Sequence, residues 1–220
     1  MMDSTGDGRA PLGPRQVPLR GTDLRERLIR SGLALIERSG HSGLSLREVA
    51  RECGVSHMAP YGFFRSKNEL LSAVAAAGFH AFRKVLTEGA AQAAPSSRSQ
   101  LTAYGLTYVE FALDHPQLLR LMFGGVIPAD QQSEELRAAH GQAFKDCTGI
   151  IAAGMGNGEF RSGDPLIAAF AGWSVVHGFT QLVLGRELQE KLGDSQDSIQ
   201  SAALRVFETF FAGLDACPPR

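Results

Sequence analysis

The sequence has little cysteine, with only Cys53, Cys147 and Cys217 among its 220 residues. Three cysteines so far apart match no zinc spacing and no disulfide framework, so we favour reduced, inert thiols over a redox sensor. No run of 18 apolar residues is present, and we therefore expect no membrane span. The first residues contain no apolar signal-peptide core, and the expected location is the cytoplasm.

The sequence also lacks the motifs of common enzyme classes. It contains no Gly-rich phosphate loop, no nucleophile elbow and no His-Glu-x-x-His metal motif. Gly154, Gly156 and Gly158 follow no predicted strand and indicate a loop, and Glu134 and Glu135 indicate a solvated helix start rather than an acid–base pair. We predict that the protein is not an enzyme, with no catalytic residue, cofactor or metal site.

Charge is nearly balanced overall but unevenly distributed. The formal net charge is −1, which alone argues against a nucleic-acid-binding protein. Residues 1–67 contain 11 Lys and Arg against 7 Asp and Glu, whereas residues 68–220 contain 11 against 16. A basic N-terminal part on an acidic body is typical of a protein that docks one end on phosphate, although a split this small is weak support by itself.

The most informative segment predicts two short helices around a tight turn. Ser45 and Glu48 have the spacing of a capping box, and Gly54 has the position of a left-handed helix stop. Ser56 is expected to cap the second short helix. The first helix would present an apolar face formed by Leu46, Val49, Ala50 and Cys53. This arrangement predicts a helix-turn-helix at 45–64, whose second helix enters the DNA major groove.

Residues 22–82 resemble the DNA-binding domain of the TetR family of transcriptional regulators. The residues that carry the resemblance are Leu44 to Ala50, Gly54-Val55-Ser56, Ala59, Tyr61, Phe64, Ser66-Lys67 and Leu70-Leu71. The resemblance implies an all-α homodimer with a three-helix DNA-binding domain on a larger helical domain that binds ligand and dimerises. Pro60 stands where the family usually has Leu, and Gly62 where a bulky or basic residue is common. The operator sequence therefore does not follow from that of a relative.

The resemblance also implies which residues hold the DNA backbone. Arg47, Tyr61 and Lys67 match family positions that contact phosphates, and such contacts are blind to sequence. Ser45 and Ser56 offer hydroxyl groups to the same backbone. The alternative for Ser56 is a helix cap and nothing more.

The resemblance implies that four further residues face the major groove, namely His57, Met58, Ala59 and Phe63. His57 could donate a hydrogen bond to a guanine acceptor, while Met58 and Ala59 could touch a thymine methyl group. The alternatives are that Met58 only fills space and that Phe63 belongs partly to the core.

The chain divides into three predicted parts. Residues 1–21 are rich in Gly, Pro and Arg and predict a disordered arm, either free or lying in the minor groove. The DNA-binding domain is expected at 22–82, and the ligand-binding and dimerisation domain at 83–220. Helical spacing predicts helices over 22–40, 67–94, 98–114, 117–123, 133–155, 165–192 and 197–216. No strand-like alternation is visible, so we predict an all-α fold.

The last two helices are predicted to form a dimer interface. One apolar stripe contains Leu166, Phe170, Trp173, His177 and Leu184, and the other contains Ile199, Ala203, Val206, Phe210 and Leu214. Together they are wider than one copy easily buries, which favours a four-helix bundle with a second copy over packing within one chain. Trp173, His177 and Gly178, with His115-Pro116 and Leu121 to Gly124, are similar to a TetR body type named for its Trp, His and Gly.

The body is also expected to enclose an apolar pocket for a hydrophobic or aromatic small molecule. The candidate ligand-binding residues are Phe111, Met122, Phe123, Phe144, Trp173 and His177. Each has an ordinary core position as its alternative, and for His177 a core or interface position is favoured. The resulting hypothesis is a repressor that binds a near-palindromic DNA operator as a homodimer and is released by this ligand. The rival hypothesis is a helical module whose head contacts a protein partner.

Overall fold

The computed structural model describes residues 24–193 and 195–215. The predicted arm at 1–21 and Cys217 lie outside the described residues. The chain is about 78% helical, and its described part contains no strand, which confirms the all-α prediction. The elements are α1 (Leu24–Ser39), α2 (Leu46–Cys53), the 3-10 helix η1 (Ala59–Gly62), α3 (Lys67–Gln92), α4 (Ser97–Asp114), α5 (Pro116–Phe123), the 3-10 helix η2 (Ala129–Gln131), α6 (Glu134–Gly156), α7 (Pro165–Leu184), α8 (Gln189–Leu192) and α9 (Gln196–Leu214).

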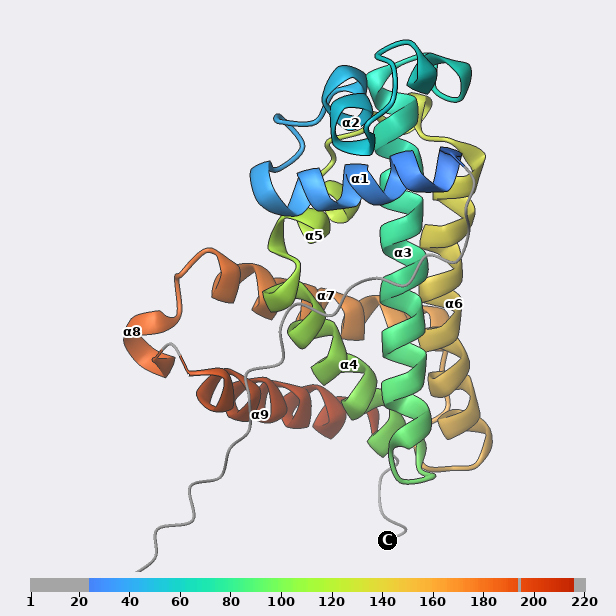
Figure 1. Cartoon of the computed structure of the whole chain (residues 1–220). Helices are drawn as coiled ribbons and strands as arrows, with labels where there is room; N and C mark the ends of the chain where they lie inside the picture. The colour runs from blue at the N-terminus through green and yellow to red at the C-terminus, as the bar shows by residue number, and fades with distance from the viewer. Residues whose placement is uncertain (1–23, 194, 216–220) are drawn as a thin grey trace, which may run out of the picture.

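The head consists of α1, α2 and η1, packed around the first turns of α3 (Figure 1, top). The Ser45 hydroxyl accepts a hydrogen bond from the Glu48 N–H at 3.1 Å, which confirms the predicted cap of α2. The Glu48 carboxylate pairs with Arg51 at 2.5 Å, so only half of the capping box forms. Gly54 ends α2 with a φ of 66°, the left-handed conformation that favours glycine.

The second short helix differs from its prediction. It is a 3-10 turn that begins at Ala59, and Met58 stands at its N-cap without a side-chain hydrogen bond. The prediction that Ser56 caps this helix is therefore wrong; Ser56 contributes its carbonyl, which accepts from the Ala59 N–H at 3.0 Å. Pro60 and Gly62 explain the short element, because Pro has no N–H for an α-helical bond and Gly is a poor helix former.

The helix α3 connects the head to the remainder of the chain, which we call the body. Its 26 residues span about 39 Å, and its N-cap is Ser66, whose hydroxyl accepts from the Glu69 N–H at 3.2 Å. In the body α4, α5 and α6 pack against α3 (Figure 1). A Cβ at Gly78 would lie 2.8 Å from Leu118 of α5, so these two helices approach closely because position 78 has no side chain.

The predicted helix over 165–192 is in fact two helices. It ends at Leu184, and Arg186 adopts a left-handed φ of 64°. The Glu187 N–H bonds back to the Leu182 carbonyl at 3.0 Å, as in a helix-terminating turn with one left-handed residue. The chain then forms the separate short helix α8.

The outer face of α7 and α9 also differs from the predicted stripes. Ile199, Ala203 and Leu214 are buried within the chain's own core, so they are not available to a second copy. The large apolar side chains that are exposed on these helices are Leu166, Ile167, Phe170, Leu182 and Leu204. We call this set the α7 face.

By length and composition alone, α7 could cross a membrane. Its most apolar 18-residue window has a mean hydropathy of 1.4, and 22% of that window is buried. This is weak evidence, because core helices of soluble proteins pass the same test. Here α7 packs against α4, α6 and α9.

Candidate nucleic-acid interface and ligand cavity

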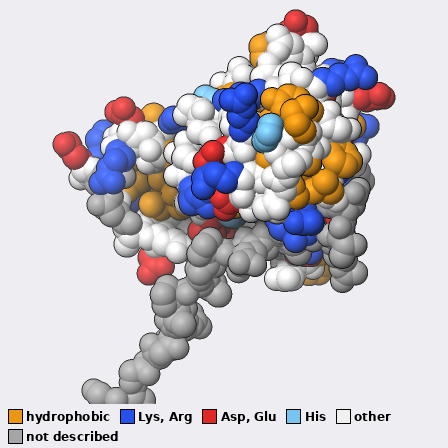
Figure 2. Space-filling view, turned by 45° about the horizontal axis from the view of Figure 1, so that its top comes forward, with side chains coloured by type: hydrophobic (Ala, Val, Ile, Leu, Met, Phe, Trp, Pro, Cys, Tyr) orange, Lys and Arg blue, Asp and Glu red, His pale blue; other side chains and the backbone are white. Residues whose placement is uncertain are grey.

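The side chains around η1 point outward from the head. Met58 is 61% exposed, Tyr61 45% and Phe63 41%, whereas the next residue, Phe64, is buried in the core. Phe63 is therefore exposed, and the phenylalanine that belongs to the core is Phe64. We call His57, Met58, Tyr61 and Phe63 the η1 face. Figure 2, which brings this end of the molecule forward, shows hydrophobic side chains gathered in a patch with Lys and Arg side chains around it.

The other residues predicted to contact DNA lie close to η1 in the chain. Ser45, Arg47, Ser56 and Lys67 are exposed, and Ala59 is half-buried. Ser45 and Arg47 stand at the start of α2, and Lys67 is the first residue of α3. The structure thus brings the nine predicted residues to the ends of three consecutive elements.

Some basic side chains of the head are paired with carboxylates, and others are not. Arg38 and Arg51 are paired with Glu52 and Glu48, at 3.0 and 2.5 Å. Arg47, Arg65 and Lys67 are exposed and have no ion pair within residues 24–193 and 195–215; the Lys67 ammonium donates only to the Ser42 carbonyl, at 3.4 Å. Cations without a carboxylate partner are available to phosphate groups.

A second candidate site is a cavity of about 80 Å³ in the body. Residues of α3, α4, α6, α7 and α9 form its walls, together with the last residue of α5. Its aromatic lining consists of His140 together with Phe79, Phe82, Tyr104, Tyr108, Phe123, Phe144, Trp173, Phe207, Phe210 and Phe211. Three predicted ligand-binding residues, Phe123, Phe144 and Trp173, are in this lining.

Three other predicted ligand-binding residues do not line the cavity. Phe111 is buried beside Phe82, with ring centroids 5.0 Å apart. Met122 lies against α3 at Gly78. His177 lies outside the lining, and its Nδ1 forms a 2.7 Å hydrogen bond with the hydroxyl of the lining residue Tyr108. These three residues thus lie outside the lining of the cavity, in line with the core or interface position that was the alternative for each of them.

Sequence reasoning missed Tyr104 and Tyr108 as cavity residues. Both lie on α4 at helical spacing, and helical spacing does not separate a core position from a cavity wall. The Tyr104 hydroxyl donates to the Ala143 carbonyl at 2.8 Å. The polar atoms of both tyrosines therefore have partners in the protein.

The cavity is electrically neutral near pH 7. Burial raises the pKa of Tyr104 and Tyr108 far above their ordinary value, and it raises the pKa of the Cys147 thiol to about 12. Burial also lowers the pKa of His140 and His177 from the ordinary histidine value, which favours the uncharged imidazoles. An uncharged apolar molecule fits such a lining better than an anion or a cation.

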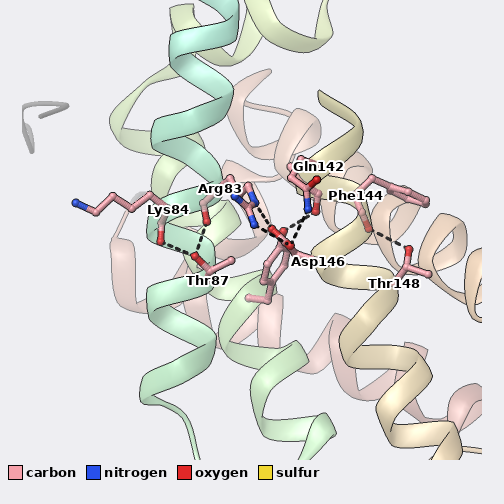
Figure 3. A network of polar contacts seen from close by, with 9 residues as sticks. Arg83, Lys84, Thr87, Gln142, Phe144, Asp146 and Thr148 are labelled. Atoms are coloured by element: carbon pink, nitrogen blue, oxygen red, sulfur yellow. Dashed lines mark hydrogen bonds and ion pairs between the residues drawn. The ribbon is translucent and has the colours of Figure 1, made fainter. Parts of the chain in front are cut away.

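A polar network holds α3 against α6 beside the cavity (Figure 3). The Arg83 guanidinium donates to both carboxylate oxygens of Asp146, at 2.5 and 3.2 Å, and Gln142 donates to the same carboxylate at 3.5 Å. Asp146 lies between two lining residues, Phe144 and Cys147. The pair thus links the helix that reaches the head to the wall of the cavity.

The short helix α5 also joins the cavity to the head. At one end, Phe123 is in ring contact with Phe79 at 5.1 Å and with His177 at 5.4 Å. At the other end, His115 Nδ1 lies 2.8 Å from the Glu37 carboxylate of α1. The helix α5 is thus in contact with the cavity wall at one end and with the head at the other.

Two family models match the chain. Residues 28–74 match the bacterial regulatory proteins of the tetR family, and residues 101–207 match the tetracyclin repressor-like C-terminal domain. No curated protein matches the sequence.

Solved structures cover nearly the whole chain. A protein with unknown function from Rhodococcus sp. RHA1 is 30% identical, with a TM-score of 0.78 over 90% of this chain and 98% of its own. A putative TetR family transcription regulator from Shewanella sp. PV-4 is 17% identical, with a TM-score of 0.63 over 88% of this chain and 98% of its own. The TetR family regulator PfmR from Thermus thermophilus is 18% identical, with a TM-score of 0.60 over 84% and 97%. The last two likenesses concern the fold alone. With both family models matched in order on one chain, the protein belongs to the TetR family of transcriptional regulators, with a helix-turn-helix DNA-binding domain and a C-terminal ligand-binding domain.

Proposed function

We propose that this regulator is a repressor that binds a near-palindromic operator as a homodimer and is released by a small, uncharged hydrophobic effector. Residues 22–82 are the proposed DNA-binding domain and 83–220 the proposed effector and dimerisation domain, in a cytoplasmic protein without a membrane partner. The proposed body is of the Trp-His-Gly type, in which Trp173 contributes to the cavity wall.

One observation carries the proposal: a single helix, α3, begins beside the η1 face and also lines the cavity. Lys67, the first residue of α3, is an exposed cation next to the η1 face, and Phe79 and Phe82 on the same helix line the cavity. Twelve residues of helix, about 18 Å, separate Lys67 from Phe79. A ligand shifts the equilibrium between two placements of α3 when it binds one placement more tightly than the other. The shared helix therefore supports control of DNA binding from the cavity.

The α7 face supports the homodimer. It is apolar and exposed in one chain, and α7 contains no Asp, Glu, Lys or Arg along its 20 residues. Pairing of α7 and α9 with the same helices of a second copy would cover it as a four-helix bundle. Two heads would then meet half-sites about 34–36 Å apart, or a multiple of that distance.

The DNA-binding proposal is tested by salt and by two substitutions. Affinity for duplex DNA should fall steeply with salt, with a slope of about 0.9 in log affinity for each phosphate neutralised. Lys67→Ala and Tyr61→Ala should each weaken binding at least about tenfold, since each removes a phosphate contact. Lys84→Ala is the matched control, because Lys84 is exposed on α3 but lies in the body. Salt-insensitive binding, or no binding to duplex at low salt, would favour the protein-binding module.

The effector proposal is tested with two small probes of similar size. Toluene is uncharged and benzoate is an anion, so toluene should bind the neutral cavity and benzoate should not. Trp173 is the only tryptophan of the chain, and its emission reports occupancy directly. Toluene should change this emission and lower operator affinity, as measured by fluorescence anisotropy. Operator affinity that stays constant at saturating toluene would contradict release from the cavity.

A further inference from the structure

The η1 face has no side chain that can make two hydrogen bonds to one base. From Ser56 to Phe64 the sequence contains no Arg, Lys, Asn, Gln, Asp or Glu. Guanine is usually read by Arg or Lys and adenine by Asn or Gln, through paired hydrogen bonds in the major groove. The hydrogen-bonding side chains of this face are His57 and Tyr61. Because the Tyr61 hydroxyl is the expected phosphate contact, His57 is left as the single side chain of the face for a hydrogen bond to a base.

What η1 presents instead is exposed apolar surface. Met58 and Phe63 flank the 3-10 turn on either side, and they are 61% and 41% exposed. Pro60, between them, is buried, so the turn is anchored in the head while the two side chains project from it. Met58 is unbranched and adapts its shape to the surface that it meets.

The charges around this surface indicate the partner. Arg47, Arg65 and Lys67 are exposed and have no carboxylate partner among the described residues. A polyanion would satisfy them, and phosphate contacts hold a protein on duplex DNA without reading its sequence. Sequence must then be read by the apolar side chains. The apolar group that a base pair presents in the major groove is the C5 methyl of thymine.

We propose that the protein recognises its operator mainly through thymine methyl groups that contact Met58 and Phe63, with His57 as the single hydrogen-bonding reader. This inference rests on the proposed DNA-binding function and specifies its chemistry. Each half-site therefore contains thymines at the base pairs beneath η1. Removing one contacted methyl should cost about 0.8 kcal/mol, or about fourfold in affinity.

The experiment starts by selecting bound duplexes from a random-sequence pool with the full-length protein. Each thymine of the selected site is then replaced by deoxyuridine, which removes the methyl group and keeps the base-pairing edge. We expect about a fourfold loss at the thymines beneath η1 and no loss at the others. Met58→Ala should abolish the difference between thymine and uracil at one position, and Phe63→Ala at another. Lys67→Ala should weaken binding to both duplexes equally.

The outcomes separate this inference from the proposed function. A selected site that binds equally well with deoxyuridine throughout would overturn methyl readout and leave DNA binding intact. Full discrimination between thymine and uracil in both Met58→Ala and Phe63→Ala would also overturn it, because the methyl groups would then touch other residues. If no sequence is selected and no salt-dependent binding occurs, the DNA-binding function itself is wrong and the inference falls with it.

Discussion

Two exposed apolar surfaces of this molecule differ in the charges that surround them. Every exposed large hydrophobic side chain of the described residues lies on the η1 face or the α7 face. The η1 face adjoins Arg47, Arg65 and Lys67, which have no carboxylate partner in the described part of the chain. By contrast, α7, which contributes Leu166, Ile167, Phe170 and Leu182 to the α7 face, contains no Asp, Glu, Lys or Arg.

The difference teaches that exposed apolar area does not by itself identify a partner. An apolar surface among unpaired cations suits a ligand with apolar groups between phosphates, as in the major groove of DNA. An apolar surface without charges suits a second apolar surface, and in a homodimer the same patch of another copy supplies it. The same side-chain type, Phe63 on one face and Phe170 on the other, is thus expected to meet two different partners.

The largest effect is expected from placing a charge on each face in turn. Ile167 is 62% exposed in one chain, so Ile167→Glu should leave the fold of the chain nearly unchanged. In the dimer, however, the carboxylate would be buried without a partner, which costs roughly 3–5 kcal/mol. We expect the dimer dissociation constant to rise by at least about 100-fold, measured by sedimentation velocity over a range of concentrations.

The matched variant is Phe63→Glu on the η1 face. It should leave the dimer intact and abolish DNA binding, because it places a negative charge against the phosphates. An unchanged dimer mass in Ile167→Glu, or a monomer in Phe63→Glu, would mean that the two faces have been assigned to the wrong partners.

The head is largely predictable because local chemistry specifies it. The Ser45 cap and the Gly54 stop act within a few residues, and the structure confirms both. The exception is η1, where Pro60 and Gly62 replace an α-helix by a 3-10 turn and leave Ser56 without a capping role. Both residues depart from the family pattern. Their joint effect, a 3-10 turn in place of an α-helix, does not follow from either substitution alone.

The body is predictable in its helices but not in its cavity. The helices expected to begin at 117, 133 and 165 begin within one residue of those positions, since capping and first-turn preferences are local. The way in which five helices pack together decides which face of each helix lines the cavity. The spacing of apolar residues along a single helix contains no information about this packing. Phe111 and Tyr108 lie on one stripe of α4, yet only Tyr108 reaches the cavity.

The smallest effect concerns the two glycines that shape the η1 face. A Cβ added at either position would meet no atom within 4 Å, but Gly54 has a φ of 66° and Gly62 is outside the left-handed region. Gly54→Ala should therefore lower the free energy of unfolding by about 1–2 kcal/mol through backbone strain. Gly62→Ala should raise it by about 0.4–1 kcal/mol by restricting the unfolded chain. Urea denaturation of the two variants measures both changes, and shifts of the same sign would contradict the view that backbone conformation decides how these positions contribute to stability.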